Sequence, residues 1–344
     1  MHHFALSIRV WYRQNHRELP WRSTKNPYKI WLSEVIMQQT RVDQGLSYYK
    51  KILERYPSVE FLAEADEQEV LRLWQGLGYY SRARNMHKAA QQVVDDFGGV
   101  FPDNYKDIKS LKGVGDYTAS AIASFAYDLP YPVLDGNAFR VLSRYFNDPT
   151  PIDTGEGAKV FKAYAEDLIS KDDPAEFNQA IMEMGAMMCR PKNPNCEHCP
   201  LNETCLSYNE GDPLSLPVKS KKVKVTKRYF HFLLHPESGI TLEKRTKKGI
   251  WQNMYQFPML EVEKKIAKSE LKKKVKERFG VELTKKVFAE KHILSHQHIE
   301  AVFWRVGGEI TLDPNVKVDL TTIHDYPLPR LIDRFIENNS ELFG

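Results

Sequence analysis

All four cysteines of the chain lie within 17 residues, as Cys189, Cys196, Cys199 and Cys205, in the spacing C-x6-C-x2-C-x5-C. Four thiolates this close together can surround one metal centre, either a tetrahedral zinc ion or an iron–sulfur cluster. Two nested disulfides are the competing use, but no apolar signal segment is visible and a chain of this length can build a core without disulfides. A zinc ribbon usually has two C-x2-C hooks and this chain has one, although His198 offers a further zinc ligand. The spacing therefore favours a 4Fe–4S cluster, with zinc as the alternative.

Length and charge indicate two domains of different character. A chain of 344 residues is long for one hydrophobic core, and it has no run of about 18 apolar residues, so we expect two domains and no membrane span. Residues 1–212 contain 24 lysines and arginines against 29 acidic residues, whereas residues 213–344 contain 25 against 16. If the first part binds nucleic acid, it must use local groups such as helix N-termini, because its overall charge is unfavourable.

Hydrophobic periodicity predicts a mostly helical first domain, residues 1–212. Apolar residues recur at three- and four-residue spacing in segments 30–53, 68–73, 82–97, 117–127, 159–169 and 177–188. Residues 213–228 have the composition of an extended basic linker. In the second domain, residues 229–344, we expect strands at 229–234, 240–244 and 302–306 and an amphipathic helix through Leu271, Val275 and Phe279. That domain is therefore predicted to be α+β.

A glycine-rich turn connects two of the predicted helices. Gly113 and Gly115 stand two residues apart, and Tyr117 opens the helix that follows. Glycines at this spacing let the backbone turn tightly and present N–H groups that can bind a phosphate without a basic side chain. Taken alone, the pattern more often marks an ordinary helix–helix connection.

Two acidic residues are candidates for chemistry. Glu34 is expected in the first turn of a helix, where an acid usually only interacts with the helix dipole, but Gln38 and Gln39 follow it and their amides could read base edges. Asp135 precedes a predicted helix beginning near residue 138, so it could be merely the N-cap of that helix.

Taken together, these features resemble the iron–sulfur branch of the helix-hairpin-helix DNA glycosylase superfamily, over roughly residues 10–208. Within that branch, the segments 19–22, 33–35, 38–40, 76–85 and 135–137 resemble the adenine DNA glycosylases of the MutY type. The resemblance implies a six-helix barrel with an iron–sulfur cluster domain, followed by a Nudix-like domain. It also implies a 4Fe–4S cofactor, and a monomer that acts on A·8-oxoguanine or A·G mispairs in double-stranded DNA in a bacterial cytoplasm, near the nucleoid.

One position separates this family from its relatives. Endonuclease III-type glycosylases carry a lysine two residues after the second glycine of the hairpin, and its amine forms a Schiff base with the sugar. The residue here is Tyr117, and a phenol cannot do this. The resemblance therefore implies an enzyme that removes a base and leaves the strand intact.

By the same resemblance, Glu34 is the general acid, and Asp135 stabilises the sugar cation or bonds to it. Tyr117 is expected to hydrogen-bond with these two carboxyl groups, and Asn137 is expected to orient them. The remaining implied contacts are with the adenine, with the DNA around it and with the DNA phosphates. The adenine pocket would include Arg17, Trp21, Arg22 and Glu183, and Gln38 would be a further substrate contact. The wedges would be Gln39 and Tyr79, and the phosphate contacts would be Gly113, Gly115, Arg190 and Lys192.

The second domain resembles a Nudix fold that has lost its catalysis. Residues 249–258 resemble the Trp…Phe-Pro element of Nudix domains, but lysines replace the metal-binding carboxylates in the helix around residues 271–280, so we expect no pyrophosphate hydrolysis. The Phe-Ser-His loop by which adenine glycosylases sense 8-oxoguanine corresponds here to Leu294, Ser295 and His296. The hydroxyl of Ser295 is retained, whereas the aromatic wedge is replaced by leucine.

Two alternatives remain at this stage. An endonuclease III-like glycosylase and lyase for oxidised pyrimidines is disfavoured by Tyr117 and by the second domain. A DNA-binding protein with a redox cluster but no catalysis is disfavoured because such a protein would not need both Glu34 and Asp135.

Overall fold

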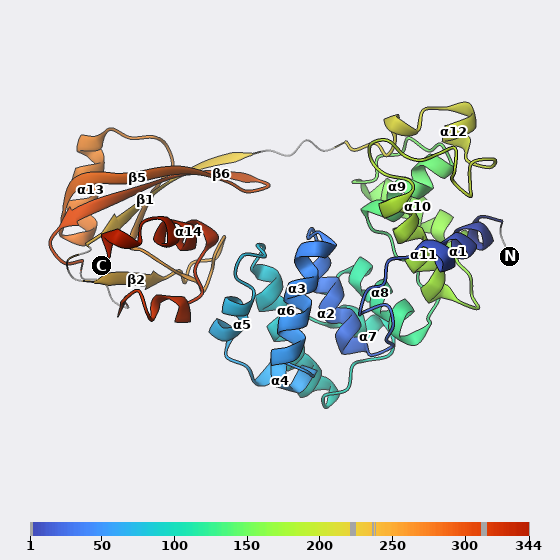
Figure 1. Ribbon diagram of the computed structural model, residues 1–344, viewed down its shortest axis with the longest axis horizontal. Helices are drawn as coiled ribbons and strands as arrows, with labels where there is room; N and C mark the ends of the chain where they lie inside the picture. Colours follow the sequence, from blue (N-terminus) through green and yellow to red (C-terminus); the bar gives the residue numbers. More distant parts are fainter. Residues whose placement is uncertain (1–2, 221–224, 236, 238, 311–314, 344) are drawn as a thin grey trace. The chain divides into compact units, whose positions relative to one another are not determined.

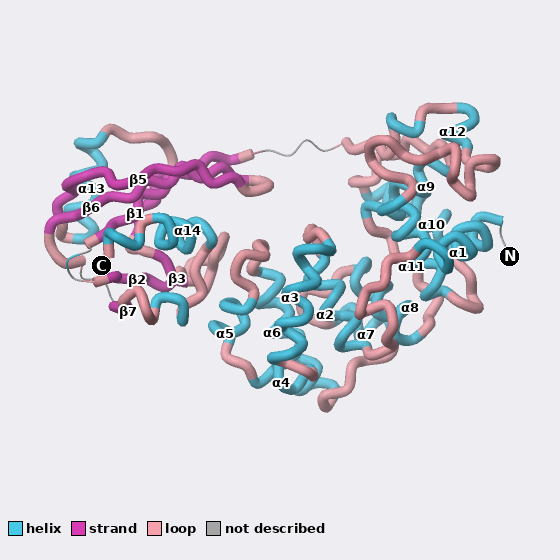
Figure 2. The backbone as a smooth tube through the Cα atoms, viewed as in Figure 1, coloured by secondary structure: helices cyan, strands magenta, loops and turns pink. Residues whose placement is uncertain are grey.

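The computed structural model describes residues 3–220, 225–235, 237, 239–310 and 315–343. These residues belong to two compact units. Figure 1 colours the chain from its N-terminus to its C-terminus and labels the helices and strands. The first unit comprises residues 1–64 and 85–222, and the second comprises residues 65–84 and 223–344. Figure 2 shows that the strands lie in the C-terminal part of the chain. Within the described ranges, no helix combines the length and apolar character needed to cross a bilayer.

The first unit is helical, as its periodicity predicted. Its helices are α1 (His3–Asn15), α2 (Pro27–Met37), α3 (Val42–Arg55), α4 (Val59–Glu64), α6 (Ser81–Phe97, which begins in the second unit), α7 (Tyr105–Ser110), α8 (Asp116–Tyr127), α9 (Gly136–Tyr145), α10 (Gly155–Leu168), α11 (Pro174–Met187) and α12 (Leu206–Glu210). One core cluster is built from buried side chains of α1, α9, α10 and α11, among them Phe4, Ile8, Phe161 and Phe177. These side chains fall on one face of each helix, which is what fixes the packing of the bundle.

The predicted helix over residues 30–53 is in fact two helices. α2 begins at Pro27, where the Asn26 side chain caps it by accepting a hydrogen bond of 3.1 Å from the Lys29 N–H. α2 ends at Met37, and Gln39 then adopts a left-handed φ of 55° that a continuous helix does not allow. Glu34 is consequently the eighth residue of α2, far from its N-terminus. The prediction that Glu34 lies in a first helical turn is wrong.

The second unit contains a mixed sheet and a smaller antiparallel sheet. The larger sheet has the strand order β4-β1-β6-β5, and the smaller has the order β3-β2-β7. The strands are β1 (Thr226–Leu234), β2 (Ile240–Lys244), β3 (Tyr255–Gln256), β4 (Met259–Val262), β5 (Glu282–Ile293), β6 (Gln297–Gly307) and β7 (Asn315–Val318). β1 runs parallel to β6, whereas the other pairs are antiparallel. The α+β prediction for this part of the chain is confirmed.

Helices complete the second unit. They are α5 (Glu67–Leu73), α13 (Lys268–Phe279) and α14 (Arg330–Asn338), with single 3-10 turns at Ile323–Asp325 and Ser340–Leu342. The apolar side chains of α13, Leu271, Val275 and Phe279, are buried against Leu283 and Trp304 of the larger sheet, as the spacing of the helix predicted. On α14, Phe335 stacks on Phe303 with ring centroids 3.8 Å apart.

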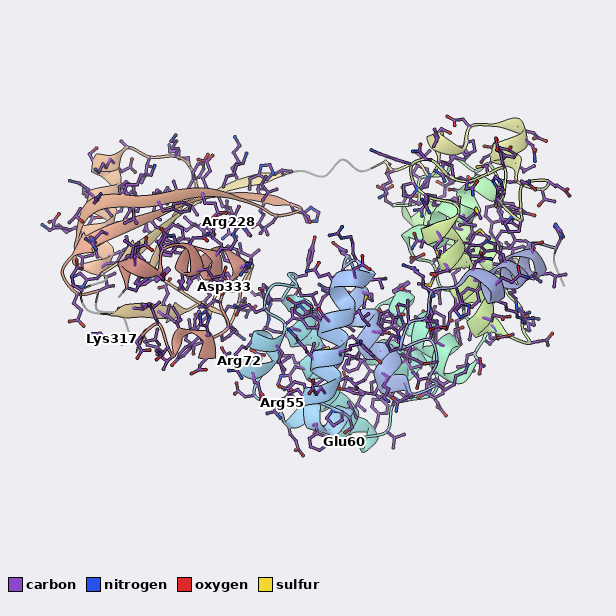
Figure 3. All side chains as sticks on the ribbon, in the orientation of Figure 1. Arg55, Glu60, Arg72, Arg228, Lys317 and Asp333 are labelled. Carbon is purple, nitrogen blue, oxygen red and sulfur yellow. The ribbon has the colours of Figure 1, made fainter. Side chains whose placement is uncertain are left out.

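Two described parts of the predicted linker, residues 213–215 and 226–228, have regular structure. Pro213–Ser215 form a 3-10 turn, and Thr226–Arg228 already belong to β1. The Arg228 guanidinium, labelled in Figure 3, pairs with Glu261 of the neighbouring strand β4 at 2.6 Å. Residues 221–224, with three of the lysines expected in the linker, lie outside the described residues.

Residues 65–84 group with the C-terminal unit, although the sequence predicted a single domain through residue 212. Specific hydrogen bonds account for this grouping. The Leu328 N–H donates to Gln75 Oε1 at 3.0 Å, and Arg84 Nη1 donates to the Gln252 carbonyl at 2.9 Å. Such contacts between distant stretches of sequence leave no periodic signal in either stretch.

Candidate active site

A buried glutamate and a half-buried tyrosine meet between α2 and α8. The Tyr117 hydroxyl donates a hydrogen bond of 2.6 Å to Oε2 of Glu34, whose side chain is only 7% exposed. Burial raises the pKa of Glu34 to about 7, against the lowering effect of the Tyr117 hydrogen bond. Burial likewise raises the pKa of Tyr117 well above its ordinary value. At neutral pH, Glu34 can therefore both hold a proton and release it, as a general acid must.

Asp135 stands at the start of α9 and is held there by three hydrogen bonds. Oδ1 accepts from the Asn137 N–H at 2.9 Å and from the Ala138 N–H at 2.7 Å, and Oδ2 accepts from Asn137 Nδ2 at 2.7 Å. Burial raises the pKa of Asp135, although these bonds act in the opposite direction. The charge of Asp135 in turn helps to raise the pKa of Glu34. Asp135 is thus both the helix N-cap and an electrostatic neighbour of Glu34.

A small cavity opens beside Glu34. Its volume is about 50 Å³, and it is lined by Trp21, Arg22, Ile30, Ser33, Glu34, Phe125, Gln179 and Met182. The sequence predicted Trp21, Arg22 and Glu34 at such a site and missed Gln179, which accepts a hydrogen bond of 2.5 Å from the Tyr12 hydroxyl. Gln179 lies one helical turn before Glu183 on α11, and this i, i+4 spacing was the signal that could have found it.

Glu183 and Arg17 do not line the cavity, but Glu183 contacts Arg22, which does. Glu183 is fully buried, and its carboxylate accepts from Arg17 Nε at 2.8 Å, Arg17 Nη2 at 2.7 Å and Arg22 Nη2 at 2.7 Å. Although burial acts against ionisation, these guanidinium bonds hold the pKa of Glu183 at about 2. Glu183 is therefore a permanent anion that fixes the side chain of Arg22 at the cavity wall.

The four cysteines border one cavity and form no disulfides. Burial raises the pKa of the Cys199 thiol to about 12 and also raises the pKa values of Cys196 and Cys205. Thiols in this setting ionise readily only when a bound cation supplies compensating charge. In the portion of the chain described, no three Cys, His, Asp or Glu side chains converge as ligands of a single ion. Four thiol donors around one cavity fit a metal centre, and the disulfide alternative is wrong.

The glycine turn has the geometry that its sequence predicted. Gly113 has a φ of 79°, and a Cβ atom there would come within 2.7 Å of the Asn85 side chain, so only glycine fits. Gly115 is the N-cap residue of α8. Because glycine has no side chain, Gly115 offers no side-chain hydrogen bond to the first N–H groups of the helix. The next residue, Asp116, brings a carboxylate to the same place and is held by the Tyr105 hydroxyl at 2.7 Å.

Comparison with known proteins places this geometry in a family. Residues 32–171 match the HhH-GPD superfamily of base excision DNA repair proteins, and residues 229–338 match the NUDIX domain. An adenine DNA glycosylase of Buchnera aphidicola from Schizaphis graminum is 34% identical over 97% of this chain and 98% of its own length. The mouse adenine DNA glycosylase is 41% identical over 60% of this chain and 42% of its own length.

The chain belongs to the adenine DNA glycosylase family. Solved structures agree on the fold of its helical part. A thermostable thymine-DNA glycosylase is 29% identical, with a TM-score of 0.56 over 60% of this chain and 95% of its own. An endonuclease III–DNA complex is 21% identical with a TM-score of 0.52 over 60% of this chain and 94% of its own. The chain is therefore a DNA N-glycosylase of the helix-hairpin-helix fold joined to a Nudix-like domain.

The residues that the family resemblance assigned to DNA are distributed over both units. In the first unit, Gln38 Nε2 donates to Thr118 Oγ1 at 3.3 Å, and Gln39 holds its left-handed φ. In the second unit, Tyr79 also has a left-handed φ, 47°, and its side chain is 42% exposed. Non-glycine residues in this backbone region carry strain that the surrounding structure must maintain. Both wedge candidates are thus presented by unusual turns.

The loop expected to sense the lesion is the tip of the β5–β6 hairpin. The Leu294 N–H donates to the Gln297 carbonyl at 2.8 Å, which closes the loop, and Ser295 and His296 are exposed. The Ser295 hydroxyl contacts the Tyr79 hydroxyl within the second unit. The structure therefore brings together two residues to which the sequence assigned different roles. Arg190 and Lys192, expected to contact phosphates, are exposed in the cysteine loop.

Proposed function

We propose that this glycosylase removes adenine from A·8-oxoguanine and A·G mispairs in double-stranded DNA and leaves an abasic site in an uncut strand. The observation that carries the proposal is the hydrogen bond from Tyr117 to the buried Glu34, beside Asp135. It supplies one proton donor and one anion, and the residue at the position of the lyase amine is a phenol.

The chemistry follows from the two carboxyl groups. Glu34 gives its proton to N7 of the flipped-out adenine, so that the C1′–N9 bond breaks and its electron pair leaves with the base. Asp135, ionised and fixed by its three hydrogen bonds, stabilises the positive C1′ or bonds to it. Glu34, now a carboxylate, then accepts a proton from water while the water oxygen bonds to C1′ and any bond to Asp135 breaks. Tyr117 keeps Glu34 in place through both steps.

The charged groups around the cavity suit a base that enters as a neutral ring. Glu183 pairs with both Arg17 and Arg22, so the donors of Arg22 at the cavity wall stand beside a compensating carboxylate. Trp21 supplies an aromatic face at the wall, and it packs edge-on against Tyr49 with centroids 5.1 Å apart. Gln179 adds an amide that can pair with a base edge.

We further propose that the four cysteines hold a 4Fe–4S cluster whose role is structural. When bound, the cluster supplies a cross-link that holds the cysteine loop, with Arg190 and Lys192, in the shape that contacts DNA phosphates. The supporting features are the shared cavity and the four free, half-buried thiols. The protein as purified should contain about four irons per chain. Zinc in place of iron would reject the assignment.

Lesion recognition is proposed to rest on Ser295, whose hydroxyl can donate to O8 and accept from N7–H of 8-oxoguanine. Its contact with the Tyr79 hydroxyl would then be exchanged for contact with the lesion. We also propose that the protein works as a monomer on nucleoid DNA in the cytoplasm.

A panel of duplexes tests the substrate assignment. Base release should be measured on duplexes that contain A·8-oxoguanine, A·G, T·G, U·G or thymine glycol. We expect adenine release from the first two and none above background from the others. Preferred release of thymine or of an oxidised pyrimidine would reject the proposal.

A further inference from the structure

Asp135 is reached through a segment that has no regular structure of its own. Residues 129–135, between α8 and α9, form neither helix nor strand. Pro130 and Pro132 have no N–H to donate, and the Tyr131 N–H is bonded to the Leu129 carbonyl at 2.8 Å. The remaining buried polar groups of this backbone must find partners outside it.

The side chain of Asn178 on α11 supplies these partners. Asn178 is fully buried, and its Oδ1 accepts from the Val133 N–H at 2.9 Å. Its Nδ2 donates to the Tyr131 carbonyl at 2.9 Å and to Ser124 Oγ on α8 at 2.8 Å. Both amide donors and the amide oxygen are therefore used, and one side chain joins α8, α11 and the segment that leads to Asp135.

Val133 connects this buried amide to the active site. Its side chain is 1% exposed and packs in a cluster with Ile30, Phe125 and Tyr117. Ile30 and Phe125 also line the cavity beside Glu34, and Tyr117 donates to Glu34. One residue separates Val133 from Asp135, so their Cα atoms are at most ~7 Å apart even in a fully extended chain. A shift of Val133 would therefore move Asp135 relative to Glu34.

We propose that Asn178 is a positioning residue that sets the place of the Asp135 carboxylate relative to Glu34 without touching the base. The inference rests on the proposed catalytic role of Asp135. This role accounts for the complete hydrogen bonding of the buried Asn178 amide. The amide bonds to a segment of chain that no helix or strand pairing holds in place. The same role also explains why Asn178 and Gln179, consecutive on α11, differ in role, since Gln179 faces the base cavity and Asn178 fixes the chain that carries the anion.

Asn178→Asp gives the most direct test, because the aspartate side chain has the same shape as asparagine. The hydrogen bonds that this aspartate can donate depend on whether it is protonated. Ionised, the new carboxyl cannot donate to the Tyr131 carbonyl or to Ser124, whereas protonated it recovers one donor. Burial favours its protonated form. The other titratable groups on the elements around it are Asp116, Tyr117 and Tyr127 on α8, Tyr131 and Asp135 on the segment, and Glu176 and Glu183 on α11. These groups and Glu34 titrate in both proteins. Dividing the rate of the variant by the rate of the wild type at each pH therefore cancels their shared effect on the pH dependence of the rate.

At pH 8, single-turnover adenine release by Asn178→Asp should be ten- to a hundredfold slower than by the wild type, the scale of misplaced reacting groups. The rate ratio should rise toward one as the pH is lowered to 5.5. Affinity for a duplex with an abasic site should stay within about twofold. Val93→Ala, a buried substitution on α6 away from this network, controls for lost stability and should show no such pH-dependent ratio.

A ratio that does not change with pH, or a rate within threefold of Val93→Ala, would overturn the proposal. If Asn178→Asp does not fold, Ser124→Ala decides, because it removes one anchor of Asn178 and leaves the segment intact. We expect a severalfold slower release from that variant with unchanged duplex affinity, and an unchanged rate would also overturn the proposal. Failure of the wild type to release adenine would instead reject the proposed function.

Discussion

Arg140 bonds directly to Asn137 and, with the same guanidinium, to the chain at Cys189. Arg140 Nη2 donates to Asn137 Oδ1 at 2.9 Å, and Arg140 Nε donates to the Cys189 carbonyl at 2.7 Å. Asn137 in turn holds the Asp135 carboxylate through its Nδ2 and N–H groups. A chain of three hydrogen-bonded side chains therefore connects the first cysteine of the loop with the proposed catalytic aspartate.

This connection predicts that damage to Arg140 affects both sites. Arg140→Leu should slow adenine release about tenfold, because Asn137 loses a partner, and should make the metal centre easier to lose. Release under single-turnover conditions and iron content after incubation with a chelator measure the two effects. Arg190→Ala, an exposed change in the cysteine loop, should weaken duplex binding and leave the release rate near that of the wild type. Equal iron retention by Arg140→Leu and wild type would contradict the connection.

The raised pKa of Glu34 has consequences for stability. When the pKa of a carboxyl group is higher in the folded protein than in the unfolded chain, the folded protein loses stability as the pH rises between the two pKa values. For Glu34, the unfolded-state pKa is about 4.5 and the folded-state pKa is about 7. Above pH 7, Glu34 therefore costs at most about 3 kcal/mol. Glu34→Gln should consequently be more stable than the wild type at pH 8, with little difference at pH 4.5. Urea unfolding at the two pH values checks this, and equal stability at pH 8 would contradict the assigned pKa direction.

The same protonation predicts how activity depends on pH. In the proposed mechanism Glu34 carries a proton when the base leaves, so single-turnover release should fall as the pH rises through about 7. Ionisation of Asp135, whose pKa burial also raises, limits the rate on the acid side. A rate that is constant from pH 6 to pH 9 would show that no group with this pKa donates the proton.

Asp116 should weaken DNA binding. Its carboxylate stands at the start of α8, where the glycine turn exposes backbone donors to a phosphate, and it is held there by Tyr105 and Lys109. Asp116→Asn should bind duplex DNA severalfold more tightly at low salt, and the difference should vanish at high salt because the site is exposed. Asp103→Asn, also an exposed change, is the control. Equal affinity of Asp116→Asn and wild type at low salt would argue that the turn does not contact phosphate.

Ser295 should contribute to the preference for the lesion. Ser295→Ala removes a hydroxyl that can pair with 8-oxoguanine, and the loss of one such bond, roughly 1 kcal/mol, corresponds to a severalfold smaller ratio of A·8-oxoguanine to A·G excision. Ser269→Ala on the exposed face of α13 is the control in the same unit. If Ser295→Ala retains the wild-type ratio, the lesion is recognised by other groups.

The sequence predicted those parts of the fold that depend on local patterns. The helices of the first unit follow from apolar spacing, and the order of the glycine turn, Asp135 and the cysteines led to the family. The start of α2 could also have been predicted, because Asn26 followed by Pro27 is a helix N-terminal signal. That signal would have placed Glu34 deep in the helix, where burial raises its pKa.

Other features had no local signal. β5 lies at the edge of its sheet and contains two register shifts, so its apolar residues do not alternate and the strand was not predicted. The grouping of residues 65–84 with the second unit and the hydrogen bonds of Asn178 depend on contacts between residues far apart in sequence. A polar residue looks the same in a sequence whether its side chain is exposed or is buried and bonded to a distant segment.

The central claim is that Glu34 and Asp135 excise adenine without a Schiff base, and one measurement tests it most directly. Adenine release and strand scission are followed in parallel on an A·8-oxoguanine duplex, with and without alkali, for wild type, Glu34→Gln and Asp135→Asn. We predict adenine release by the wild type with scission only after alkali, and release at least about a hundredfold slower in each variant with duplex binding retained. Scission without alkali at the rate of base release, or near-normal release by either variant, would contradict the account.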